Sequence, residues 1–102
     1  MDITVQELKE KLDKRDDFVL IDVREIYEHE EFNVGGKLIP IGSFMGAIPD
    51  LDEHKNGEVV VYCRSGNRSG MAVHLLRAAG FENPRNLKGG MLAWLSAFGD
   101  KV

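Results

Sequence analysis

The chain is poor in several residue types and patterns that would define a function directly. Its 102 residues include one cysteine, one tryptophan and three prolines. A single cysteine excludes an internal disulfide, a C-x-x-C redox pair and a zinc site built from several cysteines. No apolar run approaches the roughly 20 residues that span a bilayer, and the charged N-terminus lacks a signal-peptide core. We therefore expect a cytoplasmic protein without membrane contact.

Positive charge is also in short supply. The 17 acidic residues outnumber the 13 basic ones, which gives a formal net charge of −4. The overall field therefore provides no reason to expect nucleic acid as a partner, and any anion site must be local. With 43% hydrophobic and 29% charged residues, the composition is that of a globular protein, and the length predicts one domain over residues 1–102.

Apolar periodicity predicts alternating helices and strands. Thr4 and Glu7 form the capping-box pattern at the start of the first helix. Short apolar runs between charges or glycines predict strands. Such alternation is typical of an α/β domain whose mostly parallel sheet is covered on both faces. After the first helix, the sequence predicts a strand at 18–23, a short helix or turn at 24–32, a strand at 38–41, a helix at 44–51, a strand ending at 62 or 63, a helix from 71 to Gly80, a strand at 85–87 and a helix over 91–98.

Several features are better explained by structure than by chemistry. His29, His54 and His74 lie at no metal-ligand spacing, so we expect no metal site. The acidic run at residues 28–32 has the pattern of a solvated face. The apolar residues at helical spacing near the end of the chain, together with Met71, are expected in the core. Those near the end are Met91, Trp94, Leu95 and Phe98.

The stretch VVVYCRSGNRSG, residues 59–70, carries the most specific chemical signal. It places Cys63 at the carboxyl end of an apolar strand, where open parallel sheets bind ligands. The following loop leads into a helix, so its N–H groups and the helix dipole can favour an anion. Gly66 can adopt a backbone angle that other residues resist. Arg64 and Arg68 add planar donor groups suited to oxyanions.

Two interpretations of Cys63 follow from these residues. Most lone cysteines at strand ends are small buried hydrophobic residues. The polar and glycine-rich residues after Cys63 do not suit a core, whereas an electropositive loop would lower the thiol pKa and supply the nucleophilic thiolate. We therefore predict an activated cysteine beside an anion-binding loop.

Three segments in order resemble the signatures of single-domain rhodaneses, a family of sulfurtransferases. They are LIDVRE at 20–25, CRSGNRS at 63–69 and LKGGMLAW at 87–94, and the resemblance covers nearly the whole chain. It implies a rhodanese-like fold with a central five-stranded, mostly parallel sheet and helices on both faces. It also implies transfer of a sulfane sulfur from thiosulfate or a similar donor to a nucleophilic acceptor, without a metal or an organic cofactor.

The resemblance assigns roles to individual residues. Cys63 would carry the sulfur as a persulfide, and the side chains of Arg64 and Arg68 would contact the donor's sulfonate. Asp22 and Arg24 match the charged pair beside the loop, with Ser69 also in support, although the pair could equally be an ordinary ion pair at a strand end. The N–H groups expected to hold the persulfide's charge are those of Arg64, Ser65, Gly66, Asn67 and Arg68.

Other functions stay open. The spacing from Cys63 to Arg68 is C-x4-R, whereas phosphatases and arsenate reductases of this fold resemble C-x5-R, so those activities are less favoured. A module that carries or senses persulfide without turnover is the main alternative. The segment 24–36 departs from the usual family pattern near the site, which leaves the acceptor open. GGKLIP resembles rhodanese segments fused to enzymes that activate sulfur-carrier proteins, and indicates that a carrier protein is a candidate acceptor alongside cyanide or a thiol.

Overall fold

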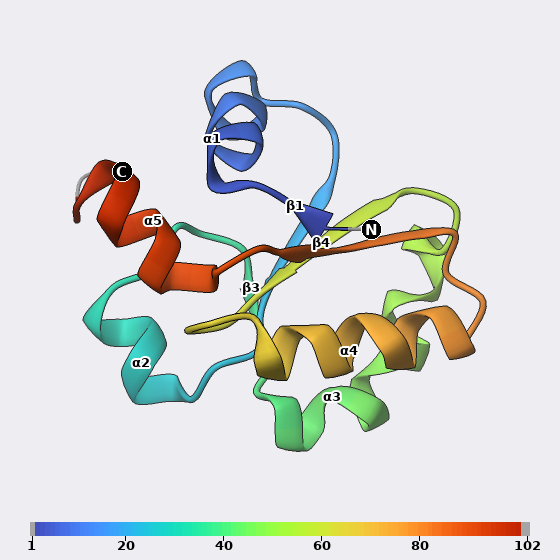
Figure 1. Ribbon diagram of the computed structural model, residues 1–102. Coiled ribbons are helices and arrows are strands. Elements are labelled where there is room, and N and C mark those ends of the chain that lie inside the picture. The colour runs from blue at the N-terminus through green and yellow to red at the C-terminus, as the bar shows by residue number, and fades with distance from the viewer. Residues whose placement is uncertain (1, 101–102) are drawn as a thin grey trace.

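A computed structural model describes residues 2–100 and has a parallel sheet at its centre (Figure 1). The sheet has five strands in the order β1-β5-β4-β2-β3, and each neighbouring pair is parallel. This confirms the predicted fold class. The strands are β1 (Asp2–Ile3), β2 (Val19–Asp22), β3 (Lys37–Leu38), β4 (Glu58–Tyr62) and β5 (Asn83–Leu87).

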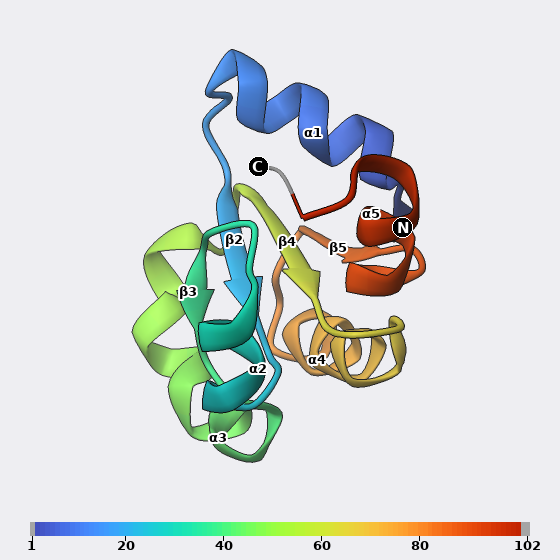
Figure 2. The same ribbon diagram turned by 90° about the vertical axis from the view of Figure 1, so that its left-hand side faces the viewer.

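Helices cover both faces of the sheet (Figures 1 and 2). Helices α3 and α4 lie on one face, and α1 and α5 lie on the other. Helix α2 lies at the edge toward which β2 and β4 run (Figure 2). No helix within residues 2–100 is long and apolar enough to cross a membrane. The helices are α1 (Val5–Lys14), α2 (Ile26–Glu31), α3 (Ile41–Ala47), the 3₁₀ helix η1 (Ile48–His54), α4 (Asn67–Ala78) and α5 (Gly90–Phe98).

Alternating strand residues build two hydrophobic clusters, one on each face. In β4, Val59 and Val61 pack toward α3 and α4, whereas Val60 and Tyr62 pack toward α1 and α5. Successive side chains of a strand point to opposite faces, so a run of apolar residues can serve both clusters. The continuous apolar sequence of β4 therefore reflects burial on both faces.

Several elements differ from the sequence prediction. The strand predicted at 38–41 is shorter, because Pro40 precedes α3 and residue 41 already belongs to that helix. The helix predicted at 44–51 ends at Ala47 and continues as η1, whose second residue is Pro49. A proline has no N–H to donate and is accommodated at the start of a helix. Strand β1 was not predicted from residue periodicity, since it has only two residues.

Met71 was predicted in the core, and this prediction is wrong. Its side chain is 60% exposed, whereas Met91 and Trp94 are buried as expected. Helix α4 buries Ala72, Val73 and Leu76 against the sheet, and Met71 lies outside that stripe.

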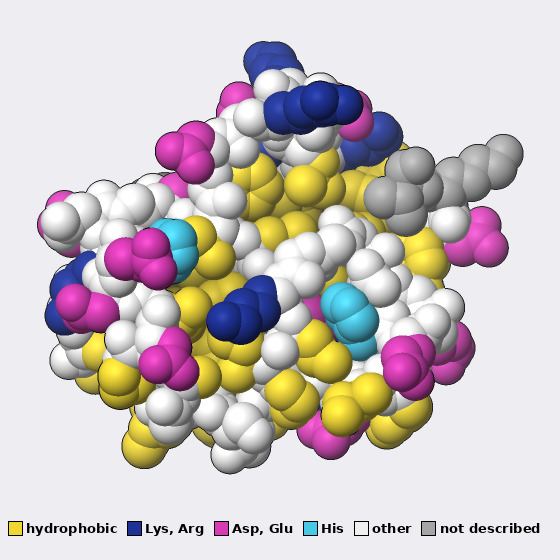
Figure 3. Space-filling model, turned by 180° about the vertical axis from the view of Figure 1, so that it is seen from behind, with side chains coloured by type: hydrophobic (Ala, Val, Ile, Leu, Met, Phe, Trp, Pro, Cys, Tyr) yellow, Lys and Arg dark blue, Asp and Glu magenta, His cyan; other side chains and the backbone are white. Residues whose placement is uncertain are grey.

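The face opposite to that of Figure 1 shows basic side chains over α1 and hydrophobic side chains across its centre and lower edge (Figure 3).

Gly90, the first residue of α5, fixes how closely this helix approaches the loop after β4. Its φ is +56°, and a Cβ there would collide with the carbonyl oxygens of Cys63 and Arg64. We predict that Gly90→Ala lowers the free energy of unfolding by about 2–4 kcal/mol, through backbone strain and overpacking. Urea denaturation measures this change.

Gly46 provides the matched control. It lies inside α3, and a Cβ there would meet no atom within 4 Å. Gly46→Ala should raise the free energy of unfolding by about 0.4–1 kcal/mol, because alanine has less backbone freedom to lose. Equal effects of the two substitutions would contradict the close approach at Gly90.

Candidate active site

Cys63 directly follows β4, at the carboxyl edge of the sheet. Strand β2, which pairs with β4, ends at the same level as β4, because Asp22 pairs with Tyr62. The loop after Cys63 turns into α4 through Gly66, which is the N-cap of that helix with a φ of 106°. This left-handed conformation suits glycine. The loop thus brings the N-terminus of α4 to the cysteine.

The sulfur of Cys63 accepts hydrogen bonds from the loop and the first turn of α4. The Gly66 N–H donates to Sγ at 3.1 Å, and the Ser69 N–H lies 3.4 Å from it. The Ser69 hydroxyl lies at 3.3 Å from the same atom. Cys63 is 1% exposed and contacts one hydrophobic cluster, but these donors surround its sulfur with positive partial charge.

These contacts lower the pKa of the Cys63 thiol. Burial by itself raises that pKa, because it disfavours the charged form. Hydrogen bonds from the Ser69 hydroxyl and from the N–H groups of Ser69, Gly66 and Ser65 outweigh it, so the net pKa lies below its ordinary value. The sulfur is therefore poised to ionise although it is buried.

Asn86 of β5 holds the loop and Ser69 together. Its Oδ1 accepts a hydrogen bond from the Ser69 hydroxyl at 2.5 Å, and its Nδ2 donates to the Gly66 carbonyl at 3.1 Å. Since the hydroxyl proton can be given to only one acceptor at a time, Asn86 and the Cys63 sulfur share the Ser69 hydroxyl. Sequence reasoning missed Asn86, whose only signal was an amide side chain in a short strand.

The start of α5 supports the other side of the loop. The Met91 N–H donates to the Cys63 carbonyl at 2.9 Å, and the Leu92 N–H donates to the Arg64 carbonyl at 3.0 Å. Unpaired N–H groups at a helix N-terminus are available for such partners. The N-termini of two helices therefore meet at the chain around Cys63.

A buried charged network lies next to this loop, at the end of β2. Asp22 is fully buried and accepts from the Arg24 guanidinium at 2.8 and 2.9 Å. Nδ1 of His29 lies 2.8 Å from the same carboxylate. Arg24 also donates to the Phe32 carbonyl at the end of α2, at 2.7 Å. Burial raises the pKa of Asp22, but the hydrogen bonds from Arg24 and His29 lower it by more than burial raises it. The net pKa of Asp22 therefore lies below its ordinary value.

This network positions α2, and α2 in turn holds Arg68. Glu28 of α2 receives both terminal nitrogens of the Arg68 guanidinium, at 2.7 and 3.0 Å. The hydrogen bonds from Arg68 lower the pKa of Glu28 from its usual 4.5 to about 2. The acidic run at 28–32 was expected to be a solvated face, and for Glu28 this is wrong, because its side chain is only 14% exposed.

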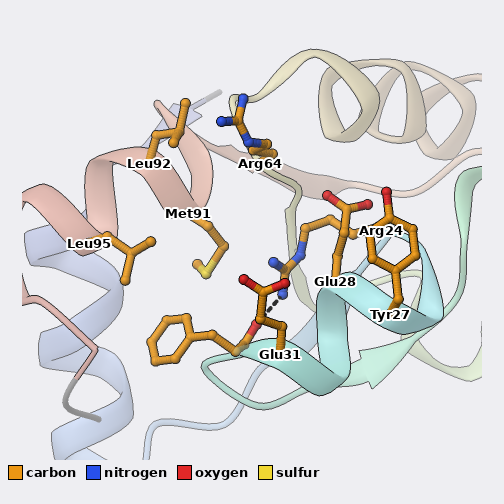
Figure 4. Close-up of a pocket in the computed structure, with 9 residues that line it drawn as sticks. Arg24, Tyr27, Glu28, Glu31, Arg64, Met91, Leu92 and Leu95 are labelled. Atoms are coloured by element: carbon orange, nitrogen blue, oxygen red, sulfur yellow. Dashed lines mark hydrogen bonds between the residues drawn. The ribbon is translucent and has the colours of Figure 1, made fainter.

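A pocket of about 300 Å³ opens between α2, α5 and the loop (Figure 4). Arg64 lies at its rim, α5 presents Met91, Leu92 and Leu95, and α2 presents Glu28 and Glu31. Leu95 was expected in the core but lines this pocket with 40% exposure. The full lining is Arg24, Tyr27, Glu28, Glu31, Phe32, Arg64, Met91, Leu92 and Leu95.

The structure thus brings together most of the residues singled out in the sequence. Ser69, Gly66 and Ser65 donate hydrogen bonds to the Cys63 sulfur, and Asp22 and Arg24 form an ion pair with each other. Asn67 begins α4. The two loop arginines differ, because Arg68 is paired with Glu28 whereas Arg64 forms no ion pair within residues 2–100. His29 lies in α2, and its Nδ1 contacts the carboxylate of buried Asp22.

Comparisons with known proteins identify the family and agree with the fold. The sequence profile of the rhodanese-like domain matches residues 4–97. The chain belongs to the rhodanese-like domain family. A solved rhodanese-like domain protein from Staphylococcus aureus is 38% identical, with a TM-score of 0.75 over 92% of this chain and 91% of that one.

Two curated relatives are longer proteins, of which this chain matches a part. YrkF of Bacillus subtilis, named as a candidate sulfur carrier protein, is 34% identical over 94 residues, which are 91% of this chain and 50% of YrkF. The Arabidopsis thaliana adenylyltransferase and sulfurtransferase MOCS3 is 33% identical over an alignment of 107 positions. This alignment covers 90% of this chain and 23% of MOCS3. The chain thus spans half of YrkF or less than a quarter of MOCS3, and the names of these two relatives refer to sulfur carriage or sulfur transfer.

Ser69 offers a direct test of the cysteine's environment in this rhodanese domain. Ser69→Ala removes the hydroxyl donor, so the pKa of Cys63 should rise and less thiolate should be present at neutral pH. We predict that the pH profile of iodoacetamide alkylation shifts to higher pH and that alkylation at pH 7 slows several-fold. Exposed Ser96 of α5 provides the control, and Ser96→Ala with the same shift would contradict the role of Ser69.

The Glu28–Arg68 ion pair predicts a pH-dependent stability. Because the pKa of Glu28 is about 2 in the folded state and near 4.5 otherwise, its contribution is full above about pH 5 and is lost as the pH falls toward 2. Glu28→Gln should therefore cost about 1–3 kcal/mol of unfolding free energy at pH 6 and clearly less at pH 3. Urea denaturation at both pH values measures the difference.

Exposed Glu30 of α2 is the matched control for this measurement. Glu30→Gln removes the same formal charge from the same helix. Unlike Glu28, Glu30 forms no ion pair within residues 2–100. It should change stability little at either pH. A cost for Glu28→Gln that is the same at pH 6 and pH 3 would show that the ion pair is not the cause.

Proposed function

We propose that this rhodanese domain is a sulfurtransferase that moves a sulfane sulfur through a persulfide on Cys63. The observation that carries the proposal is the ring of donors around Sγ, with Gly66 N–H at 3.1 Å and the Ser69 hydroxyl at 3.3 Å. Such preorganised donors stabilise an anion without reorganising during the reaction. They suit a thiolate as attacking group and a persulfide as intermediate.

In the first step the Cys63 thiolate attacks the outer sulfur of thiosulfate or a similar donor. A new S–S bond forms to Cys63, the donor's S–S bond breaks, and sulfite leaves with the bonding electron pair. The total charge is unchanged, because the thiolate's negative charge becomes that of the persulfide and sulfite leaves as a dianion. Low-pKa thiolates carry out such exchange at neutral pH.

In the second step an external nucleophile attacks the outer persulfide sulfur. The Cys63–sulfur bond breaks, the acceptor takes that sulfur, and the Cys63 thiolate returns. The chain has one cysteine, so no resolving thiol of its own can complete this step. Cyanide, a small thiol or a sulfur-carrier protein can serve as acceptor, and the names of YrkF and MOCS3 support the last of these.

The side chains around the loop divide the remaining work. We assign the donor's sulfonate to Arg64, which is among the residues that line the pocket and has no ion-pair partner within residues 2–100. Arg68 is held by Glu28, so we assign it a positioning role in place of the direct sulfonate contact expected from the sequence. Asp22 and Arg24 position α2, and therefore Glu28, through the bonds to His29 and Phe32.

Persulfide formation is the most direct test. We predict that incubation with thiosulfate adds one sulfur atom, about 32 Da, to the intact mass of the wild type. Cys63→Ser should gain no sulfur under the same conditions. A wild type without the adduct, or an adduct of equal yield on Cys63→Ser, would reject the proposal.

The same sample separates turnover from carriage. If the persulfide discharges to cyanide or a thiol faster than a free persulfide does in solution, the domain is an enzyme. If it forms but discharges no faster, the domain is a persulfide carrier or sensor, which is the alternative function. Hydrolysis of a phosphate or reduction of arsenate is disfavoured by the C-x4-R loop.

A further inference from the structure

We propose that Asn86 is a positioning residue for sulfur transfer, because it is a second acceptor for the Ser69 hydroxyl and holds that hydroxyl whenever the Cys63 sulfur carries no charge. Its part in sulfur transfer rests on the proposed function. The competition for the hydroxyl follows from the contacts of Asn86 themselves, and it is tested without any sulfur donor.

The contacts of Asn86 fix the orientation of its amide. The Asn86 Nδ2 donates to the Gly66 carbonyl at 3.1 Å. A carbonyl oxygen only accepts, so the amide nitrogen has to face it, and the amide oxygen Oδ1 then faces Ser69. Because Oδ1 also only accepts, the Ser69 hydroxyl is the donor in the contact of 2.5 Å between these two oxygens.

The same hydroxyl reaches the Cys63 sulfur at 3.3 Å. A hydroxyl has one proton to donate, and Ser69 is fully buried, so water does not replace either partner. When the proton points to the sulfur, Asn86 Oδ1 loses its donor and two oxygens face each other without a proton between them. Asn86 therefore opposes the hydrogen bond from Ser69 to the sulfur.

The charge on the sulfur decides between the two acceptors. A thiolate accepts strongly, because hydrogen bonds to an ionised group are roughly twice as strong as neutral ones. A thiol or the inner sulfur of a persulfide accepts weakly, so the hydroxyl then turns to Asn86. The hydroxyl only rotates about its Cβ–Oγ bond, and its proton stays on the Ser69 oxygen.

This exchange involves no formal charge. The charged side chains around the sulfur are the Asp22–Arg24 pair at the end of β2, the Glu28–Arg68 pair, and Arg64 in the loop. Within residues 2–100, none of these side chains hydrogen-bonds to the amide or to the hydroxyl. Neutral substitutions of the amide or the hydroxyl therefore leave the formal charges around the sulfur unchanged.

In sulfur transfer the hydroxyl would follow the charge of Cys63. When the thiolate takes up the donor's sulfur, the negative charge passes to the outer sulfur, and the hydroxyl returns to Asn86. When the acceptor attacks, the bond between the two sulfurs breaks and its electron pair goes to Sγ of Cys63. The hydrogen bond from Ser69 then forms with the developing charge, and so it stabilises the transition state more than the persulfide.

Asn86 also limits how far Ser69 can lower the acidity constant of the thiol. It accepts the hydroxyl while Cys63 is a thiol, and a hydrogen bond that accompanies the neutral form raises a pKa. Nucleophilicity falls as the pKa of a thiol falls. Ser69 thus favours ionisation of the sulfur, whereas Asn86 preserves its reactivity.

A double-mutant cycle tests the competition. The pH profile of iodoacetamide alkylation gives the thiol pKa of the wild type, Ser69→Ala, Asn86→Ala and the double variant. Ser69→Ala should raise this pKa more in the Asn86→Ala background, because the hydroxyl then serves the sulfur alone. The two rises should differ by about 0.5 to 1 pH unit, which corresponds to one hydrogen bond.

The cycle isolates the hydroxyl from the second contact of Asn86. Asn86→Ala also removes the donor to the Gly66 carbonyl, but it does so in both halves of the cycle, so that effect cancels. If Asn86 instead directed the hydroxyl toward the sulfur, Ser69→Ala would raise the pKa less in the Asn86→Ala background. A smaller rise or an equal rise would overturn the inference.

Exposed Asn83 provides the matched control, since it carries the same side chain on the same strand. In the Asn83→Ala background, Ser69→Ala should raise the thiol pKa as it does in the wild type, and an enlarged rise there would also contradict the inference. Urea denaturation checks that each variant is folded. If Asn86→Ala does not fold, Asn86→Val replaces it in the cycle, because valine suits a strand and accepts no hydrogen bond.

The same four proteins test the part of Asn86 in sulfur transfer. They are loaded with thiosulfate, and discharge of the persulfide to cyanide is followed by intact mass. Ser69→Ala should slow discharge by a factor about two- to fivefold larger in the Asn86→Ala background than in the wild type. An equal or smaller factor would overturn the role in transfer.

The outcomes separate this inference from the function on which it rests. If no persulfide forms, the proposed function fails, and alkylation still reports whether Asn86 competes for the hydroxyl. If persulfide forms and discharges but the alkylation cycle shows no enlarged effect of Ser69→Ala, only the assignment of Asn86 is overturned.

Discussion

The site depends on one interaction, the solvation of a buried sulfur by N–H and O–H donors instead of water. Cys63 is 1% exposed, and burial alone would keep its thiol protonated. Gly66 and Ser69 reverse this because their donors reach Sγ. Those donors are in place only while the loop enters α4 with Gly66 in its left-handed conformation, so the fold and the acidity of the thiol are linked through a single turn.

The surrounding contacts hold that turn from three directions. Asn86 of β5 ties Ser69 to the Gly66 carbonyl, and the first N–H groups of α5 bind the carbonyls of Cys63 and Arg64. On the third side, Glu28 holds Arg68. The loop is therefore fixed by neighbours from a strand and two helices, which is what a preorganised site requires.

The sequence predicted the fold class and the location of the cysteine because these follow from local patterns. Apolar β4 followed by glycines and arginines is readable along the chain. The partners of the loop are not, since Glu28 and Arg68 are 40 residues apart and Asn86 comes 17 residues after Ser69. Periodicity also misplaced Met71 and Leu95, because helical spacing shows which residues share a face but not how wide a stripe the sheet covers.

In the function that we propose, the pairing of Arg68 with Glu28 affects how sulfur transfer can proceed. Because the positive charge of Arg68 is paired with Glu28, the negative sulfur is held mainly by dipoles. The unpaired formal charge of Arg64 lies at the pocket rim. Dipoles act over short distances and serve a thiolate and a persulfide alike. A site of this kind stabilises both states of Cys63 without holding the departing sulfur by a fixed charge. In the proposed reaction, the sulfur can then leave as readily as it arrives.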